Sequence, residues 1–207
     1  MSDSGQLIVI SAPSGTGKST VIKAVKDRMD KIVYSVSHTS RAPRYDEING
    51  TDYFFVSEPE FERMIAENAF AEWAKVYNAY YGTSFDTLKQ NIVKGFDVIL
   101  DIDSQGAANI RKHFESSVLI FLIPPDLETL KNRLIHRGKD SETVIKSRMA
   151  LAEYNIKQCP WYDYIVINDD LEKTIADVCS IITAERRRAA RMLFNKTIKS
   201  NLKLSDI

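Results

Sequence analysis

Short apolar runs alternate along this chain with segments in which apolar residues recur every three or four positions. The runs are rich in Val, Ile and Leu, which is typical of strands buried on both faces of a parallel sheet. They lie at residues 7–10, 31–37, 98–103, 118–123 and 164–168. Strands and helices that alternate in this way predict an open α/β fold, in which ligands bind at the carboxyl ends of the strands.

The segments with helical spacing follow these runs. They predict helices at residues 18–29 and 104–113, around Leu130 and Ile145, and from Leu171 onward. The basic far end of the last helix, residues 185–203, is expected to be solvated or frayed. Two shorter helices are indicated by their ends, because Ser57 and Glu60 form a capping box and Gly95 follows an apolar helical face.

Residues 38–84 depart from the alternation. Asn49-Gly50 is a strong turn signal, and the aromatic residues at 52–56 predict a strand after it. Residues 70–77 predict a second strand, and the sequence Tyr-Tyr-Gly-Thr-Ser at 80–84 predicts a turn rich in hydroxyl groups. The segment is therefore expected to form a lobe with hairpin character, inserted into the α/β core.

The stretch between the first strand and the first helix reads Ser-Ala-Pro-Ser-Gly-Thr-Gly-Lys-Ser-Thr. A Gly-rich turn in this context directs backbone N–H groups at a phosphate. Lys18 adds a positive charge for the outer phosphates of a nucleoside triphosphate, and Ser19 adds a hydroxyl for the accompanying Mg²⁺. Ala12 stands where the usual pattern has Gly. The alternative is a turn that only connects strand and helix, and the Lys-Ser pair at the helix start favours the nucleotide site.

Other polar residues are expected near the same edge of the sheet. Asp101, Asp103 and Asn168 end two of the predicted strands, so they and the Gly-rich turn should converge. Arg41 and Arg44 lie in a polar loop interrupted by proline, where two guanidinium groups can grip a second phosphate. The alternative for this loop is a solvated basic surface.

Composition narrows the classes of function. The 207 residues suit one main domain with small insertions, and 28 basic residues balance 28 acidic ones, so the net charge is zero. This balance argues against binding of long nucleic acid. The N-terminus lacks the pattern of a signal peptide, no apolar run approaches membrane-spanning length, and Cys159 and Cys179 lack metal-ligand spacing. A cytoplasmic protein without membrane partners is expected.

These motifs together resemble those of the guanylate kinase family over nearly the whole length of the chain. The resemblance is carried by residues 11–19, 37–44, 49–55, 70–73, 80–83, 100–106, 137–138 and 167–170. The P-loop alone is shared by many ATPases. The Ser-x3-Arg-x2-Arg loop, together with Tyr-Tyr-Gly and Asp-x-Asp, is far more specific, and the family begins its P-loop with Gly or Ala.

The resemblance implies an α/β fold of the P-loop nucleoside monophosphate kinase type, with a parallel sheet core flanked by helices. The core would comprise residues 1–37, 85–125 and 151–207, with a β-rich GMP-binding lobe at 38–84 and a small helical lid at 126–150. The implied reaction is transfer of the γ-phosphoryl group from ATP to GMP, which gives ADP and GDP, with Mg²⁺ as cofactor. It belongs to purine nucleotide metabolism and GMP recycling. The oligomeric state stays open between a monomer and a small homo-oligomer.

The family's functional residues are carried over by position. Catalytic roles would fall to Lys18, Arg137 and Arg148. ATP would be bound by Ala12, Pro13, Ser14, Gly15, Thr16, Gly17, Lys18, Ser19 and Asn168, the last near the adenine. GMP would be bound by Ser37, Arg41, Arg44, Tyr53, Glu72, Tyr81, Thr83 and Asp103. Mg²⁺ would be held by Ser19 and, through water, by Asp101.

The chemistry of guanine agrees with these roles. The carboxylate of Glu72 can accept hydrogen bonds from guanine N1–H and N2–H₂ together, and the hydroxyls of Ser37 or Thr83 can donate to O6. Structural alternatives stay open: Tyr53 and Tyr81 as strand aromatics, Glu72 and Arg148 as surface residues, and Asp101 as a helix cap.

Two other functions are alternatives to the guanylate kinase hypothesis. A guanylate-kinase-like binding module without catalysis is disfavoured, because Lys18, Ser19, Arg137 and Arg148 are all present and the chain has no room for partner domains. A kinase for another nucleoside monophosphate is disfavoured by Glu72 and the β-rich lobe.

Overall fold

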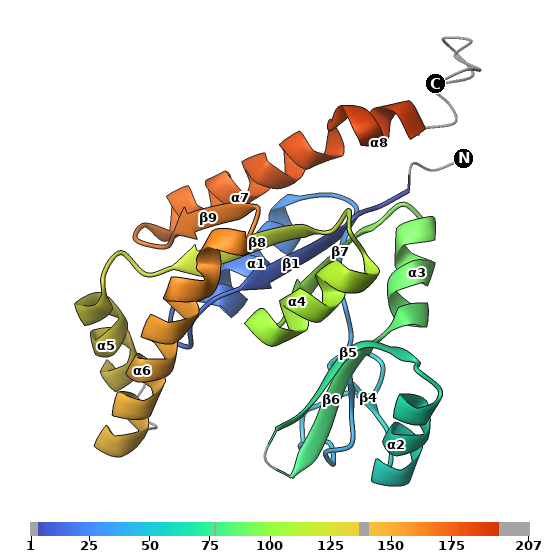
Figure 1. Ribbon diagram of the computed structural model, residues 1–207, viewed down its shortest axis with the longest axis horizontal. Helices are drawn as coiled ribbons and strands as arrows, with labels where there is room; N and C mark the ends of the chain where they lie inside the picture. Colours follow the sequence, from blue (N-terminus) through green and yellow to red (C-terminus); the bar gives the residue numbers. More distant parts are fainter. Residues whose placement is uncertain (1–3, 77, 137–140, 195–207) are drawn as a thin grey trace.

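A central parallel sheet organises the protein, as the alternation of strands and helices predicts. The computed structural model describes residues 4–76, 78–136 and 141–194. Five strands form the sheet in the order β2-β7-β1-β8-β9, and every neighbouring pair is parallel. They are β1 (Leu7–Ser11), β2 (Ile32–Tyr34), β7 (Asp97–Asp101), β8 (Val118–Ile123) and β9 (Tyr164–Ile167). Figure 1 shows this sheet with helices on both faces.

Each face of the sheet buries its own apolar cluster, because successive residues of a strand point to opposite faces. On one face, Ile8 and Ile10 of β1 pack with residues of α1 (Lys18–Arg28) and α7 (Leu171–Arg186). On the other face, Leu7 and Val9 pack with residues of α3 (Phe85–Val93) and α4 (Ser104–His113). The 3₁₀ helix η1 (Cys159–Trp161) and the strand–helix connections complete this second cluster.

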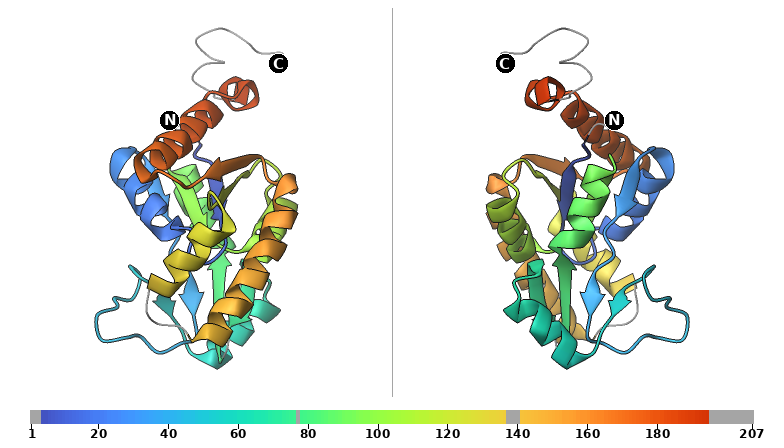
Figure 2. Two further views of the ribbon diagram at one scale, coloured as in Figure 1. Left: turned by 90° about the vertical axis from the view of Figure 1, so that its left-hand side faces the viewer. Right: turned by 90° about the vertical axis from the view of Figure 1, so that its right-hand side faces the viewer.

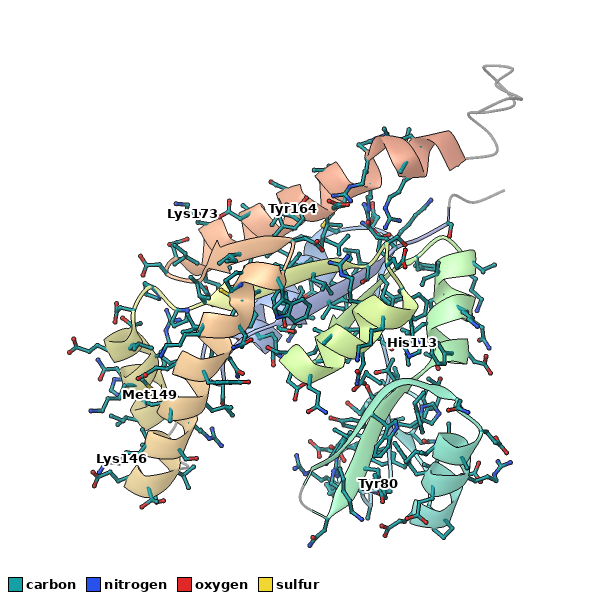
Figure 3. All side chains as sticks on the ribbon, viewed as in Figure 1. Tyr80, His113, Lys146, Met149, Tyr164 and Lys173 are labelled. Atoms are coloured by element: carbon teal, nitrogen blue, oxygen red, sulfur yellow. The ribbon has the colours of Figure 1, made fainter. Side chains whose placement is uncertain are left out.

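The inserted lobe has a sheet of its own. Its four strands, in the order β4-β3-β6-β5, are β3 (His38–Thr39), β4 (Phe54–Phe55), β5 (Phe70–Val76) and β6 (Ala79–Ser84). Helix α2 (Glu58–Ala66) covers this sheet, and the ring of Phe61 stacks on Phe70 and Tyr80 at centroid distances of 4.4 and 5.2 Å. Figure 3 labels Tyr80 within this packing. The predicted cap of α2 is confirmed, since the Ser57 side chain accepts a hydrogen bond from the Glu60 N–H.

The prediction of a turn at residues 80–84 is wrong, because these residues form most of β6. The strand pairs antiparallel with β5 over almost its whole length, from Phe70↔Ser84 to Val76↔Ala79. Tyr and Thr favour strands, but Gly and Ser, which favour turns, concealed this preference. Gly82 is required by close packing: a Cβ there would lie 2.9 Å from Trp73 Cβ and 3.0 Å from the Glu72 carbonyl oxygen.

Helices α5 (Leu127–His136) and α6 (Glu142–Gln158) form the region predicted as a lid. Leu130 and Leu134 of α5 pack with Ala152 and Met149 of α6 (Figure 3). Helix α6 continues without a break past residue 150 and leads into η1. In both views of Figure 2 these two helices and the inserted lobe project from the same side of the central sheet, while α7 lies across the opposite side.

The C-terminal helix differs from the prediction in two ways. It ends at Arg186 and is followed by the short α8 (Ala189–Phe194). The start of its basic end is also anchored rather than solvated, whereas Arg187 and Arg188 are exposed as predicted and residues 195–203 lie outside the described residues. Glu185 is only 4% exposed and accepts a hydrogen bond of 2.6 Å from the Tyr164 hydroxyl, and Arg186 pairs with the buried Asp97 at 2.7 Å. In the described ranges, no helix combines the length and the hydropathy that are needed to cross a bilayer.

Candidate active site

The Gly-rich turn between β1 and α1 has the geometry of a phosphate-binding loop. Gly15 and Gly17 adopt φ angles of 93° and 100°, in the left-handed region that favours glycine. The Thr16 N–H donates to the Pro13 carbonyl at 3.2 Å, which closes the turn immediately before α1 begins at Lys18. The N-terminus of α1 and the loop therefore present backbone N–H groups where a phosphate would lie.

Asn168 supports this loop from the neighbouring strand end. It is buried, and its Nδ2 donates to the Thr16 carbonyl at 2.6 Å. Arg133 of α5 donates to the Asn168 carbonyl at 3.0 Å and to the Thr16 carbonyl at 3.4 Å. Asn168 thus lies beside the loop, as the convergence of strand ends predicts. Arg133 was missed from sequence, because nothing in its local pattern distinguishes it from a surface arginine of an amphipathic helix.

Lys18 connects the loop to β7. Its ammonium forms an ion pair with the carboxylate of Asp101 and donates to the Ile102 carbonyl at 3.4 Å. Both side chains are 20% exposed, so solvent reaches the pair. Asp101 does not cap the next helix, because that role falls to Asp103, whose Oδ1 accepts a hydrogen bond of 2.8 Å from the Gly106 N–H. The sequence left both roles open for Asp101, and the structure places it beside the loop lysine.

A cavity of about 240 Å³ lies between the inserted lobe and the carboxyl end of β7. Five of the residues predicted to bind GMP line it, namely Ser37, Tyr53, Glu72, Tyr81 and Asp103. Its walls also include Tyr34, Asp52, Ala74, Gly82, Asp101 and Ile102, which were not predicted to bind GMP. Tyr34 lies outside any motif, so only the fold could place it here, whereas Asp52 belongs to the motif at residues 49–55 but was given no role.

Glu72 is a half-buried acid of this cavity. The Thr83 hydroxyl donates to its Oε1 at 2.7 Å, and Ser37 Oγ lies 3.4 Å from Thr83 Oγ1. Burial raises the pKa of Glu72 above its ordinary value, and the nearby Asp103 carboxylate raises it further, against the hydrogen bond from Thr83. Three of the four residues predicted to read guanine, Glu72, Thr83 and Ser37, thus form one hydrogen-bonded cluster, and the fourth, Asp103, lies beside it.

The basic loop brings Arg41 next to the aromatic residues of the lobe. Its guanidinium carbon lies 5.6 Å from the centre of the Tyr53 ring, and the rings of Tyr53 and Tyr81 are 5.9 Å apart. Arg41 forms a two-fold ion pair with Glu47, at 2.8 and 2.9 Å. Arg44 is exposed, and its backbone N–H donates to Glu47 Oε2 at 2.7 Å.

The remaining predicted residues divide between the loop and the lid. Arg148 of α6 donates to the Ser14 hydroxyl at 3.4 Å, which joins α6 to the loop between β1 and α1. Ser19 is exposed in the first turn of α1. Arg137 lies outside the described residues, as does Gly138 after it. Among the described residues, the structure therefore brings the predicted catalytic side chains Lys18 and Arg148 to the same loop.

The comparisons with known proteins agree with this arrangement. A family model described as guanylate kinase matches residues 4–185. The chain is 46% identical over 193 residues to guanylate kinase of Geobacter sulfurreducens, covering 93% of this chain and 95% of that protein. It is 50% identical over 185 residues to guanylate kinase of Haemophilus influenzae, covering 88% and 89%.

A solved structure supports the fold. The crystal structure of guanylate kinase from Anaplasma phagocytophilum superimposes with a TM-score of 0.75 at 31% sequence identity, covering 97% of this chain and 96% of that one. The match extends over both sheets and the flanking helices, since nearly all of each chain is covered. On these grounds the chain belongs to the guanylate kinase family, whose activity is transfer of the γ-phosphoryl group from ATP to GMP.

Proposed function

We propose that ATP binds at the loop between β1 and α1, that GMP binds in the cavity of the inserted lobe, and that the phosphoryl group passes between them beside Lys18 and Asp101. One observation carries this proposal. The segment from Asp101 to Asp103 borders both places, because Asp101 pairs with Lys18 of the loop and all three residues line the cavity. A donor at the loop and an acceptor in the cavity would therefore be neighbours.

Guanine recognition is assigned to the hydrogen-bonded cluster of Glu72, Thr83 and Ser37. The Glu72 carboxylate would accept hydrogen bonds from guanine N1–H and N2–H₂, while Ser37, Thr83 and Asp103 complete the polar lining. The Thr83 hydroxyl already donates to Glu72, so it holds the carboxylate in one orientation before the base arrives. Adenine has an unprotonated N1, which would face the carboxylate with a lone pair and leave its charge unpaired.

The acceptor phosphate is assigned to Arg41, Arg44, Tyr53 and Tyr81. Guanidinium groups suit phosphate, because their N–H donors match its oxygens two at a time. The tyrosine hydroxyls add donors at the mouth of the lobe, and Arg41 lies against the Tyr53 ring. Residues 38–84 would therefore act as one unit that grips both ends of GMP.

The donor phosphates are assigned to the loop N–H groups, Lys18, Arg148 and Arg137. Phosphoryl transfer requires charge and alignment more than covalent help, and fixed cations stabilise the negative charge of the transferring group. The residues also suit Mg²⁺, which prefers a few protein oxygens and completes its shell with water and phosphates. The Ser19 hydroxyl, and the Asp101 carboxylate through water, would hold it, and the ion would supply positive charge to the phosphates of ATP. Asn168 would contribute by fixing the loop through Thr16.

The surroundings of the reaction are part of the same proposal. The expected ligands are free nucleotides rather than long nucleic acid, since 28 basic and 28 acidic residues give no global positive field. The proposed location is the cytoplasm, with no membrane partner. A monomer or a small homo-oligomer fits equally well, because both nucleotide sites are built from residues of a single chain.

Base choice provides the sharpest test. Initial rates with GMP, AMP, CMP and UMP would be measured for the wild type, for Glu72→Ala and for the control Glu67→Ala, which removes an exposed carboxylate of the same lobe. A hydrogen bond with a charged partner contributes roughly 1.5–3 kcal/mol, so Glu72→Ala should lower kcat/KM for GMP about 10- to 150-fold. AMP makes no such bond, and its residual rate should fall much less. An equal loss for GMP and AMP would show that Glu72 is structural.

A further inference from the structure

Glu47 lies among the proposed phosphate ligands but is not one of them. It stands between the basic loop and the Asn49-Gly50 turn, and its side chain is only 14% exposed. Its Oε1 accepts a hydrogen bond of 2.8 Å from Arg41 Nη2, and its Oε2 accepts one of 2.9 Å from Arg41 Nη1. The same Oε2 accepts a third hydrogen bond of 2.7 Å from the Arg44 N–H. One carboxylate thus ties together the two arginines that are assigned to the GMP phosphate.

This pairing leaves one edge of the Arg41 guanidinium available. Both donors of Nη1 are engaged, because it also donates to the Ala42 carbonyl at 2.7 Å. Nε is buried and has no hydrogen-bond partner among the described residues. The Glu47 pair raises the pKa of Arg41 against the effect of burial. The guanidinium is thus oriented by Glu47 and lies against the ring of Tyr53, which lines the proposed GMP cavity.

We propose that Glu47 is a positioning residue for the acceptor phosphate: it holds Arg41 and the Arg44 main chain in one orientation before GMP binds, so that the Nε edge of Arg41 remains for the phosphate. The inference rests on the proposed assignment of Arg41 and Arg44 to that phosphate. An arginine side chain that is free in solution loses much rotamer entropy when it is immobilised. Because Glu47 has already immobilised Arg41, this loss of side-chain entropy does not reduce the affinity for GMP.

The charge of Glu47 suits this role. Hydrogen bonds from Arg41 and from the Arg44 N–H lower the pKa of Glu47, so the carboxylate stays ionised at neutral pH. A two-fold pair between a carboxylate and a guanidinium fixes the plane of both groups, which a single contact does not. A competing role is also conceivable, in which Glu47 occupies Arg41 as a substitute for the phosphate and has to be displaced. The two roles predict opposite changes in affinity for GMP.

The test is the Glu47→Gln variant, which keeps the size of the side chain and removes its charge. Rates would be measured with varied GMP at saturating ATP and with varied ATP at saturating GMP. The KM for GMP should rise about tenfold, the lower end of the contribution of a charge-assisted hydrogen bond, while kcat and the KM for ATP stay near the wild-type values. The matched control is Glu60→Gln, which breaks the exposed Glu60–Arg63 pair on α2 of the same lobe and should leave all three constants unchanged.

A double-mutant cycle with Arg41→Met separates this inference from the assignment on which it rests. If Arg41 binds the phosphate, Arg41→Met alone raises the KM for GMP, and adding Glu47→Gln to it has little further effect. An unchanged KM in Arg41→Met would overturn the phosphate assignment itself. If Arg41→Met raises the KM but Glu47→Gln leaves it unchanged or lowers it, the positioning role is wrong. The proposal would also be overturned if Glu47→Gln raised the KM for GMP equally in the wild type and in Arg41→Met and lowered the unfolding temperature. Glu47 would then be a residue that stabilises the fold.

Discussion

The position of the Lys18 side chain depends both on the local sequence and on a tertiary contact. The Gly-Lys-Ser sequence places it in the first turn of α1, but its ammonium is held by Asp101, a residue 83 positions further along the chain. The pair keeps a cation beside the loop before any phosphate is present. Because both side chains are 20% exposed, exchange of this partner for phosphate oxygens would be inexpensive.

Lys18→Met should lower kcat by at least about tenfold while the protein stays folded, because the side chain contacts Asp101 and solvent rather than the apolar core. Circular dichroism and steady-state rates measure the two effects. Lys23→Met, which removes an exposed lysine of the same helix, is the control and should keep the wild-type kcat. An unchanged kcat in Lys18→Met would exclude its role at the transferring phosphoryl group.

If Glu72 binds guanine as proposed, GMP binding should depend on pH. Its pKa is raised by burial and by Asp103, so it becomes protonated at a higher pH than an exposed carboxyl group. The proposed bonds to guanine need the ionised form, and the KM for GMP should therefore rise as pH falls from 7 toward 5. By linkage, the stability associated with Glu72 changes in the opposite direction, since a raised pKa favours the folded state at low pH and that gain is lost as pH rises.

The matched measurement is the same pH series with Glu72→Gln, which cannot titrate. The phosphate of GMP itself titrates with a pKa of about 6, and this contribution is common to both proteins. The wild type should lose affinity more steeply than the variant on acidification. Parallel curves for the two proteins would mean that Glu72 does not titrate in this range or does not contact the base.

At the scale of elements, β6 shows where local signals mislead. Its sequence contains Gly82 between Tyr81 and Thr83, and a glycine in a strand usually marks a close approach of another chain segment. Here β5 makes that approach, with Trp73 Cβ and the Glu72 carbonyl oxygen directly opposite. The close contact brings Glu72 beside Thr83, which is the contact that orients the carboxylate.

Gly82→Ala should destabilise the lobe by about 1–3 kcal/mol, because an added Cβ overlaps backbone and side-chain atoms of β5. The KM for GMP should rise as the lobe is destabilised. The KM for ATP should change little, since the loop between β1 and α1 belongs to the central sheet region and not to the lobe. Denaturant unfolding measures the first effect and steady-state kinetics the second. An unfolding midpoint equal to that of the wild type would show that β5 and β6 can separate without cost.

At the scale of the whole molecule, the inserted lobe and the pair α5–α6 project from the same side of the central sheet (Figures 1 and 2). The proposed GMP ligands come mainly from the lobe, and Arg148 comes from α6. Productive transfer requires that these parts enclose both nucleotides and exclude water from the phosphoryl group. Gly95, with a φ of 85°, ends α3 between lobe and core, whereas Gly82 lies inside a paired strand and is no candidate for bending.

Addition of GMP together with a non-hydrolysable ATP analogue should make the protein more compact. Small-angle X-ray scattering would record a decrease in the radius of gyration, smaller with either nucleotide alone because each contacts only part of the enclosing surface. The control is CMP with the same analogue, which lacks the purine donors that Glu72 accepts. A radius of gyration that stays constant with both nucleotides would contradict closure.

Elements whose signals are local could be predicted from the amino-acid sequence. The bounds of β8 and α4 agree with the prediction, because a continuous apolar run and a helical period with an N-cap need no distant partner. The geometry of the loop between β1 and α1 was equally accessible, since it depends on glycines at fixed spacing before a helix. The resemblance to guanylate kinases supplied the residues predicted to bind GMP, and five of them line one cavity.

Contacts between side chains that are far apart in the sequence could not be predicted without the folded structure. These contacts depend on how separate segments pack. They include the pairing of β6 with β5, the hydrogen bonds of Arg133 and Asn168 beside the loop, and the position of Tyr34 in the cavity wall. The Arg41–Glu47 pair is only six residues apart, but a polar loop without helical or strand period has no fixed geometry from which to infer it. Periodicity reports which face of an element is buried, whereas the partner of a polar group is set by the path of the folded chain.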